Sequence, residues 1–352
     1  MALIVGTLGD DRPLNDPAGD DDTIFGDSAA VVNLATGSDR IFGRDGDDVI
    51  AGDAPIIGPL GKAGDDIIFG GDGSDTVYGD ASKQLFGRGG DDIIYQNGGP
   101  GRLIGDALEV EGGARGGNDQ LFGGGTLVGD SVFEIASGRC GNDILDASAA
   151  TVASFLYGDV EQGDLDGNTV GGWDRLSGGR FRDLLVGDAE DVDDVSRGGD
   201  DRLWGDAGGD VLCGDAEQSI FERGSGGDDV LRGGAGWDVL YGDAPLLADF
   251  ATGGDDILYG GNGDDELWGD GELDGSATGG RDRFVFGGTF GDDTVQDFRR
   301  GEDVLVFEGF DRADVELTLD ASDRVVTVDG VHTVRLVDFA GPLTFGVDLV
   351  FA

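Results

Sequence analysis

The sequence is poor in the residues that carry most enzyme and redox chemistry. It contains two cysteines, Cys140 and Cys213, one histidine, His332, and one methionine. So few cysteines do not predict a disulfide framework, and a single histidine excludes the HExxH motif of zinc proteases. We interpret both cysteines as filler at variable positions of the repeat described below, and His332 as an ordinary hairpin residue.

Long apolar runs and catalytic motifs are also missing. No stretch approaches the length of a membrane-spanning helix, and the apolar run Ala2–Val5 lacks the basic region of a signal peptide. No G-x-S-x-G elbow, which would carry a serine nucleophile, occurs. Acidic pairs such as Asp47–Asp48 resemble glycosidase carboxylates, but they recur in almost every repeat, which favours ligand or turn roles. We therefore expect no enzymatic activity.

Positive charge is scarce. The 352 residues include 23 Lys and Arg against 73 Asp and Glu, for a formal net charge of −50. This charge excludes nucleic acid as a partner and makes a membrane surface an improbable one. Self-repulsion destabilises a compact chain, yet hydrophobic residues make up 38% of the sequence and fall at regular positions. The composition therefore predicts a fold whose acids are neutralised by divalent cations.

Glycine is abundant and periodic. There are 71 glycines and only 7 prolines without a period of three, which excludes collagen. Instead, a Gly-Asp pair follows a short apolar run at intervals of 24 to 29 residues, centred near 27. The pairs are Gly26-Asp27, Gly52-Asp53, Gly79-Asp80, Gly105-Asp106, Gly129-Asp130, Gly158-Asp159, Gly187-Asp188, Gly214-Asp215, Gly242-Asp243 and Gly269-Asp270.

This regularity predicts an all-β, parallel β-roll (a β-helix or solenoid) of about ten coils with a 27-residue period. Each coil is expected to contain two strands, a short turn and a long turn, with two parallel sheets facing each other across an aliphatic core. The first-strand inward residues are Ile41, Ile68, Ile94, Leu121, Leu145, Leu176, Leu203, Leu231, Leu258 and Phe284. The second-strand residues are Ile24, Ile50, Val77, Leu103, Leu127, Leu156, Leu185, Leu212, Leu240 and Leu267.

The short turns carry a nine-residue motif. Gly70–Tyr78 reads GGDGSDTVY and matches G-G-x-G-x-D-x-U-x. Glycines permit the turn and the close approach of backbone carbonyls to an ion, and Asp supplies the hard oxygen that calcium selects. With further matches at 43–48, 205–210, 233–238 and 260–265, and a weaker one at 178–183, the chain resembles the RTX (repeats-in-toxin) family.

The resemblance implies that several Ca²⁺ ions are held by glycine-region carbonyls and motif aspartates of adjacent coils. In the short turns the implied metal residues are Asp48, Gly70, Asp72, Gly73, Asp75, Asp183, Gly205, Asp210, Gly233, Gly236, Asp238, Gly260, Gly263 and Asp265. The middle turns, 96–101, 123–125 and 147–154, depart from the motif, so we expect calcium to be absent or sparser there.

The long turns open with the Gly-Asp pair and close with another aspartate. The implied metal residues are Asp53, Asp80, Asp106, Asp188, Asp215, Asp243 and Asp270 at the opening, and Asp66, Asp92, Asp119, Asp174, Asp201, Asp229, Asp256 and Asp282 at the close. Asp143 closes a loop in the same way. The usual RTX coil consists of two nonapeptides, whereas the 27-residue period here implies an insertion of about nine residues on the long-turn side. Whether the long turns bind calcium in the standard RTX geometry is therefore an open question. The alternative is that these Gly and Asp residues only form turns.

Two apolar stripes allow two readings each. Residues after the Gly-Asp pair form either a satellite core beneath the long loops or a lateral surface for assembly; they are Ile56, Ile57, Leu108, Val132, Phe133, Val160, Val192, Ile220, Phe221, Leu246, Leu247 and Leu273. Outward aromatic residues form either a stabilising ladder or a packing or carbohydrate-binding surface; they are Phe25, Phe42, Phe69, Tyr78, Tyr95, Phe122, Tyr157, Trp204, Tyr241, Tyr259 and Trp268.

The pattern changes in the C-terminal part, so we divide the chain into a repeat domain, 1–284, and a capping segment, 285–352. A hairpin with a turn at Asp329-Gly330 is predicted to cover the edge of the last coil. The final residues, Asp348–Ala352, resemble the uncleaved C-terminal signal of type I secretion substrates, and also fit a last edge strand.

Together these features predict a secreted, extracellular or cell-surface protein that folds when it binds calcium. We expect a structural or interaction role, such as a self-assembling surface layer, matrix or filament component. The alternatives are a calcium-dependent adhesin that binds polysaccharide and a membrane-active secreted effector. The expected partners are calcium, the type I secretion machinery, and either further copies of the chain or a cell-surface polysaccharide.

Overall fold

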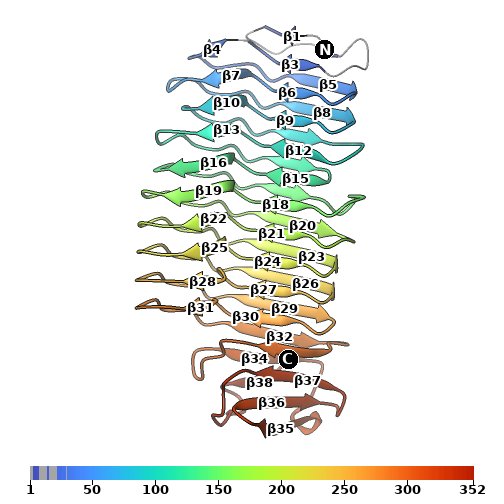
Figure 1. The fold of residues 1–352 in the computed structure, drawn as a ribbon, viewed down its shortest axis with the longest axis vertical. Helices are drawn as coiled ribbons and strands as arrows, with labels where there is room; N and C mark the ends of the chain where they lie inside the picture. The colour runs from blue at the N-terminus through green and yellow to red at the C-terminus, as the bar shows by residue number, and fades with distance from the viewer. Residues whose placement is uncertain (1–2, 8–13, 16–21, 29) are drawn as a thin grey trace.

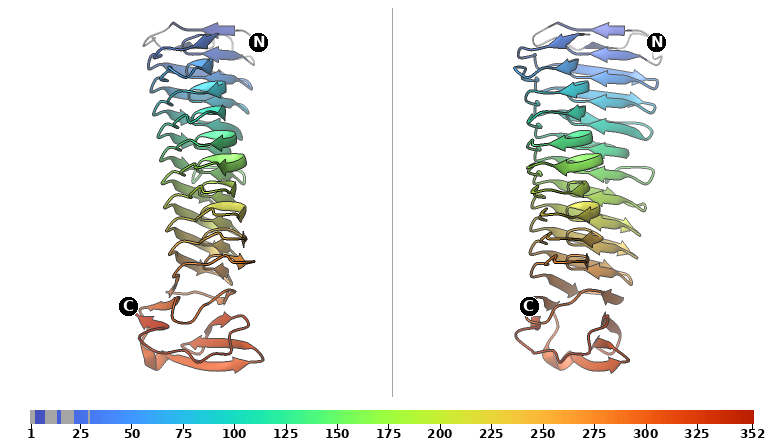
Figure 2. Two further views of the ribbon diagram at one scale, coloured as in Figure 1. Left: turned by 90° about the vertical axis from the view of Figure 1, so that its left-hand side faces the viewer. Right: turned by 60° about the vertical axis from the view of Figure 1, so that its left-hand side comes forward.

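The protein is a parallel β-solenoid. The computed structural model describes residues 3–7, 14–15, 22–28 and 30–352, so the beginning of the predicted 1–284 block lies partly outside the described residues. The coils stack along one axis, and the C-terminal strands close one end (Figures 1 and 2). Within the described residues the single helical element is the 3₁₀ turn η1 (Arg312–Asp314), and no helix there is long and apolar enough to cross a bilayer. The predicted fold class is therefore confirmed.

The first sheet collects the strands that precede the short turns. Its 13 strands pair in parallel and in register, so that Leu203, Leu231 and Leu258 align. In sheet order they are β2 (Leu14–Asn15), β5 (Arg40–Asp45), β8 (Ile67–Asp72), β11 (Ile93–Tyr95), β14 (Gln120–Phe122), β17 (Ile144–Asp146), β20 (Arg175–Gly179), β23 (Arg202–Gly208), β26 (Val230–Gly236), β29 (Ile257–Asn262), β32 (Arg283–Gly287), β34 (Val304–Glu308) and β38 (Leu349–Phe351).

The second sheet collects the strands between the short turns and the Gly-Asp pairs. It has 15 strands, which pair in parallel except for the last two pairings along the sheet, which are antiparallel. In order they are β1 (Leu3–Val5), β3 (Thr23–Phe25), β6 (Val49–Ala51), β9 (Thr76–Tyr78), β12 (Gly101–Ile104), β15 (Gly125–Val128), β18 (Phe155–Tyr157), β21 (Leu184–Val186), β24 (Val211–Cys213), β27 (Val239–Tyr241), β30 (Glu266–Trp268), β33 (Asp292–Val295), β37 (His332–Leu336), β36 (Asp323–Val328) and β35 (Val315–Asp320).

The main core lies between these two sheets. Every predicted inward residue of the first strands, from Ile41 to Phe284, and of the second strands, from Ile24 to Leu267, is fully buried in one cluster. Alternation along each short strand places one aliphatic side chain per strand inside the roll. No coil encloses this core alone, so stacking supplies the burial.

A third sheet was not predicted. Its 10 parallel strands lie in the long loops, beside the two-sheet roll (Figure 1). In chain order they are β4 (Val31–Val32), β7 (Ala54–Ile57), β10 (Ala81–Leu85), β13 (Ala107–Val110), β16 (Ser131–Ala136), β19 (Val160–Asp166), β22 (Ala189–Val192), β25 (Ala216–Ile220), β28 (Leu246–Leu247) and β31 (Glu272–Leu273). The expectation of two strands per coil was therefore wrong, because the long loop contributes a third.

The third sheet encloses a second core. Ile57, Val160, Val192, Ile220 and Leu247 are fully buried there, together with alanines that follow the Gly-Asp pairs. The segments that lead from each third-sheet strand back to the first sheet (the returning segments) also pair from coil to coil through single parallel bridges, such as Lys62 with Arg88. The satellite-core reading is confirmed for these residues. Other members of the stripe remain partly or largely exposed: Ile56, Leu108, Phe133, Phe221, Leu246 and Leu273.

The outward aromatic residues form two different groups. Phe42, Phe69, Tyr95 and Phe122 stack in a half-exposed ladder on the first sheet, with ring centroids 4.9, 5.1 and 5.0 Å apart. On the second sheet, Tyr78 and Tyr157 are buried in a third apolar cluster that also contains Val132. These two tyrosines point away from the main core but are covered, whereas the other predicted outward aromatic residues are partly exposed: Phe25, Trp204, Tyr241, Tyr259 and Trp268.

The C-terminal hairpin has the predicted turn. Strands β36 and β37 pair antiparallel around Asp329 and Gly330, which both have positive φ, at 55° and 69°. Asp-Gly is favoured in such a turn. Strand β37 then extends the second sheet by pairing with β33, while β38 extends the first by pairing with β34. The boundary between 284 and 285 falls inside β32, and the division into two domains stays a prediction.

The second core can be tested with two matched truncations. Leu247→Ala removes a fully buried side chain, so we expect a loss of about 2–5 kcal/mol in the free energy of unfolding of the calcium-loaded protein. Leu60→Ala makes the same change at a side chain that is 86% exposed, and we expect a change within about 0.5 kcal/mol. Thermal or denaturant unfolding measures both, and equal effects would contradict a second core.

Candidate metal sites in the two turn columns

The short turns bring their aspartates into one buried column. The carboxylate of each motif aspartate accepts a hydrogen bond through Oδ1 from the backbone N–H of the motif aspartate one coil earlier. The distances from Asp210 N to Asp238 Oδ1 and from Asp238 N to Asp265 Oδ1 are 2.8 and 2.9 Å. This hydrogen bond fixes the orientation of each carboxylate, and the second oxygen, Oδ2, is buried without a hydrogen-bond partner in Asp210, Asp238, Asp265 and Asp293.

The glycines of the motif make room for these oxygens. A Cβ added at Gly233 would lie 2.5 Å from Oδ2 of Asp238 and 2.6 Å from the carbonyl oxygen of Gly260. Gly236 has φ of 151°, and a Cβ there would lie 1.5 Å from the carbonyl oxygen of Gly208. Carboxylate and carbonyl oxygens therefore converge on a space from which side chains are excluded, and such hard oxygen donors suit calcium.

The long turns form a second column with two aspartates per coil. The opening aspartate accepts a hydrogen bond from a glycine N–H at the far end of the same loop, as in Gly254 N to Asp243 Oδ1 at 2.8 Å. This contact draws the ends of the loop together. The closing aspartate accepts a hydrogen bond from its counterpart one coil earlier, as in Asp66 N to Asp92 Oδ1 at 2.6 Å. The opening aspartate thus closes its own loop, and the closing aspartate links adjacent coils.

Turn formation leaves many carboxylate oxygens unused. Among the closing aspartates, Oδ2 is buried without a hydrogen-bond partner in Asp66, Asp92, Asp119, Asp143, Asp174, Asp201, Asp229 and Asp256. Among the opening aspartates, the same holds for one oxygen of Asp53, Asp159, Asp215 and Asp243. Oxygens of Asp143, Asp159 and Asp174 lie within 4.8 Å of one another. An unpaired buried carboxylate is costly, so these residues fit a row of divalent cations.

Burial raises the pKa of these carboxyl groups in the metal-free protein. Desolvation is the largest cause, and it raises the pKa of Asp53 to about 8 and that of Asp265 to about 7. The pKa of Asp66 is also raised well above its usual value, first by burial and then by the charges of Asp92 and Asp53. Without a cation, the folded state therefore favours protonated carboxyl groups.

One end of the long column contains a cation of the protein itself. Arg299 Nη2 lies 2.5 Å from Asp270 Oδ2 and 3.6 Å from Asp282 Oδ2. The same guanidinium nitrogen donates a hydrogen bond of 2.9 Å to the carbonyl oxygen of Gly280. Arg299 therefore neutralises the last aspartates of the column where the regular repeats end.

A side-chain amide replaces the motif glycine in the eroded part of the short column. Gln96 Nε2 donates to the carbonyl oxygens of Gly98 and Gly73, at 2.7 and 3.1 Å. These are backbone oxygens of two neighbouring turns, so the amide hydrogens satisfy carbonyl oxygens that a cation would contact in a regular turn. Two coils further along the chain, Ser154 stands at the position of the motif aspartate. Its backbone N–H donates a hydrogen bond to Asp183 Oδ1 at 2.6 Å.

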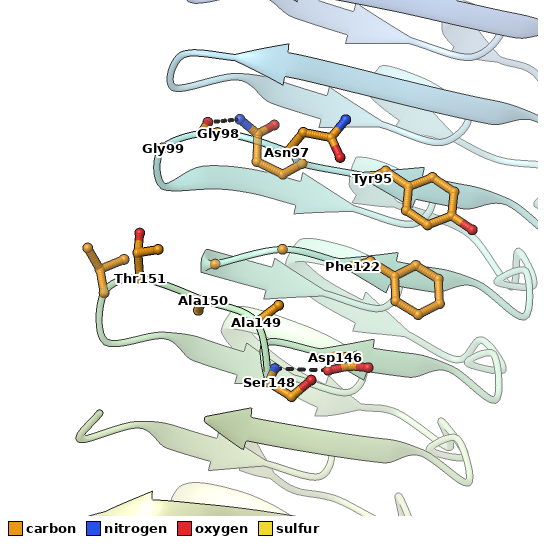
Figure 3. A pocket seen from close by; sticks show the side chains of 14 residues that line it. Tyr95, Asn97, Gly98, Gly99, Phe122, Asp146, Ser148, Ala149, Ala150 and Thr151 are labelled. Carbon is orange, nitrogen blue, oxygen red and sulfur yellow. Dashed lines mark hydrogen bonds between the residues drawn. The ribbon is translucent and has the colours of Figure 1, made fainter. Parts of the chain in front are cut away.

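The eroded turns enclose a pocket of about 340 Å³. Tyr95 and Phe122 line it on the strand side, and the turn around Ala149–Thr151 lines it on the other side (Figure 3). The Ser148 N–H donates to Asp146 within this turn, at 2.9 Å. The departure from the motif that the sequence shows thus produces a hollow in the solenoid edge in place of a regular turn.

Most of the predicted metal residues lie in the two buried columns, and the columns also contain aspartates that the sequence analysis did not name. Asp72 is exposed on the outside of its turn, away from the buried column. The ligand role of the predicted residues stays a prediction. Asp39, Asp293 and Asp303 are buried in the same columns. Asp39 stands 27 residues before Asp66, and Asp293 stands 28 after Asp265, so strict use of the period would have found both.

The comparisons with known proteins agree with the motif. The sequence matches the RTX calcium-binding nonapeptide repeat (4 copies) at residues 34–54, 60–82, 169–191, 196–218, 223–244 and 250–274. The matched segments are therefore RTX calcium-binding repeats, and Ca²⁺, bound at multiple sites, is the cofactor of such repeats. The matches leave out 83–168, which includes the eroded turns.

Comparison with solved structures adds one named neighbour. It is the extracellular lipase LipA from Serratia marcescens, with 20% sequence identity and a TM-score of 0.25. The alignment covers 99% of this chain and 40% of the lipase chain, so the chain spans less than half of the lipase. No curated protein matches the sequence.

The raised pKa values predict how pH acts on the metal-free protein. A carboxyl group with a raised folded-state pKa stabilises the fold below its usual pKa near 3.8, and this contribution is lost as pH rises through about 7 for Asp265 and about 8 for Asp53. In chelator, we therefore expect more β structure and a higher melting temperature near pH 5 than near pH 8. Circular dichroism measures both, and greater stability at the higher pH would contradict the assignment.

The ion pairs of Arg299 predict that its replacement weakens the C-terminal end of the long column. Arg299→Gln leaves Asp270 and Asp282, each 1% exposed, without their cation, which costs about 3–5 kcal/mol at a buried pair. We expect this variant to need a higher calcium concentration to fold than the wild type. Arg281→Gln removes an exposed arginine of the same region and should leave the calcium midpoint unchanged. Equal midpoints for both variants would contradict the role of Arg299.

Proposed function

We propose that the protein is a secreted structural protein, without catalytic activity, whose fold is completed by calcium outside the cell. The observation that supports this most directly is the pair of columns of buried aspartates with unpartnered oxygens. The formal net charge of −50 makes the metal-free chain self-repelling. Calcium supplies the positive charge and the coordination that these oxygens require, so its binding energy becomes folding energy.

The same coupling suits export. Where calcium is scarce, repulsion among the carboxylates keeps the chain unfolded, and an unfolded chain is compatible with passage through a type I secretion channel. The C-terminal residues proposed as the signal, Asp348–Ala352, include edge strand β38, and Arg300 lies 3.5 Å from Asp348. In the unfolded chain this segment is released from the sheet and accessible to the secretion machinery.

The sheet ends support self-assembly as the extracellular role. Strands β1, β2 and β4 are each the outermost strand of their sheet among the described residues, and β31 ends the third sheet at the opposite end. Outermost strands present unpaired backbone groups that pair readily with another chain. Association of coils end to end would continue the stack and produce a filament or lattice.

Sedimentation velocity tests this proposal. We expect the pure protein to form large particles with calcium and to return to slowly sedimenting, unfolded chains with excess chelator. A compact monomer at all calcium concentrations would contradict self-assembly. A chain that is a compact monomer in calcium and unfolded in chelator would leave the calcium-dependent fold in place and favour a binding role, whereas a compact monomer in chelator would contradict that fold as well.

A second candidate function is binding of polysaccharide. The half-exposed ladder of Phe42, Phe69, Tyr95 and Phe122 continues to the pocket of the eroded turns, and Arg40 lies 5.3 Å from the centroids of both Phe42 and Phe69. Aromatic rings beside polar groups suit sugar rings. A glycan array with calcium-loaded protein tests this role, and the double variant Phe69→Ala with Tyr95→Ala should lose binding while it still folds.

A further inference from the structure

Cys140 occupies a glycine position of the long column. In most other coils this position, three residues before the closing aspartate, is glycine, and in the first two it is Thr36 and Ala63; the glycines are Gly89, Gly116, Gly171, Gly198, Gly226, Gly253 and Gly279. A Cβ added at Gly116 would lie 1.7 Å from Asp130 Oδ1, and one at Gly171 would lie 1.9 Å from Asp188 Oδ1. A side chain at this position is therefore directed at the opening aspartates of the column.

The thiol of Cys140 lies among carboxylates. The Sγ of Cys140 and carboxylate oxygens of Asp130 and Asp159 lie within 4.8 Å of one another. Both aspartates are fully buried, and Oδ1 of Asp159 has no hydrogen-bond partner. The oxygens of Asp130 accept hydrogen bonds from the N–H of Gly141, at 2.9 and 3.2 Å, so this carboxylate is held in place.

The site is open to solvent on one side. A groove of about 380 Å³ runs along the returning segments of four coils and reaches Cys140, which is itself partly exposed. Its rim consists largely of exposed polar residues such as Asn118 and Arg139. A hydrated ion can therefore reach the thiol from the groove and retain a water molecule there.

We propose that this level of the column binds a thiophilic divalent cation, such as Zn²⁺, through Cys140, Asp130 and Asp159. Calcium takes oxygen ligands only, whereas a thiolate with carboxylates favours zinc and its congeners. Binding replaces the S–H bond by a metal–sulfur bond and releases the proton to solvent. The three side chains leave a fourth position for water from the groove, which completes a tetrahedral shell.

The competing account is that Cys140 only fills space. Its side chain also packs against the second core, and a thiol is a common small hydrophobe. The two accounts differ in what a soft metal does. A space-filling thiol beside carboxylates would leave calcium at this level, and a soft metal would form no bond to sulfur.

Cadmium is a suitable probe because a cadmium–thiolate bond gives a charge-transfer absorption in the ultraviolet. The calcium-loaded full chain is kept reduced with a phosphine and titrated with Cd²⁺ alone. We expect one equivalent to produce the absorption in the wild type. Cys140→Gly, which introduces the residue found in most other coils, and Cys140→Ser should both abolish it. Cys213→Ser is the matched control, because Cys213 is buried in a separate apolar cluster, and it should retain the absorption.

The outcomes separate the accounts. Loss of the absorption in both Cys140 variants, with Zn²⁺ displacing Cd²⁺ from the wild type, supports the site. No absorption in the wild type, or absorption that persists in Cys140→Gly, overturns it. Circular dichroism of each variant in calcium shows that the solenoid is folded, so failure of this site is distinguishable from failure of calcium-dependent folding.

Discussion

The rest of the structure depends on how carboxylates are buried between two apolar cores. The opening and closing aspartates of the long turns lie between the main core and the core of the third sheet, with exposures of 0 or 1% for nearly all of them. One oxygen of each closing aspartate serves the backbone of the neighbouring coil, and the other is directed into the column. A row of cations bound at this place would link both cores to the stacking of coils.

The exceptions show the same physical requirement. Arg299 supplies positive charge where the long column ends, Gln96 supplies hydrogen-bond donors where the short motif fails, and Cys140 places a thiol among the carboxylates at one level. Cys140 and Gln96 stand where other coils have glycine, and a Cβ at the equivalent Gly116 or Gly70 would lie 1.7 or 2.6 Å from a carboxylate oxygen of the column. The columns therefore constrain sequence more strictly than the exposed turns do.

Much of the fold was predictable because a short period repeats many times. The inward aliphatic residues, the parallel stacking and the hairpin at Asp329-Gly330 all followed from local patterns. The third sheet did not, because strands such as β28 and β31 are two residues long and Ala244 carries no strand signal. The contacts of Cys140 depend on which side of its long loop faces the column, and Arg299 lies between β33 and β34, beyond the last third-sheet strand, so residue spacing alone determines neither.

The central claim is that calcium coordination, and not general charge screening, allows these carboxylates to be buried. Far-ultraviolet circular dichroism at neutral pH, with Ca²⁺, Mg²⁺ and NaCl compared at equal ionic strength, tests it most directly. Calcium alone should produce the full β signal, because magnesium retains its water shell and dehydrates reluctantly. Full β structure in excess chelator, or an equal response to NaCl, would contradict the account.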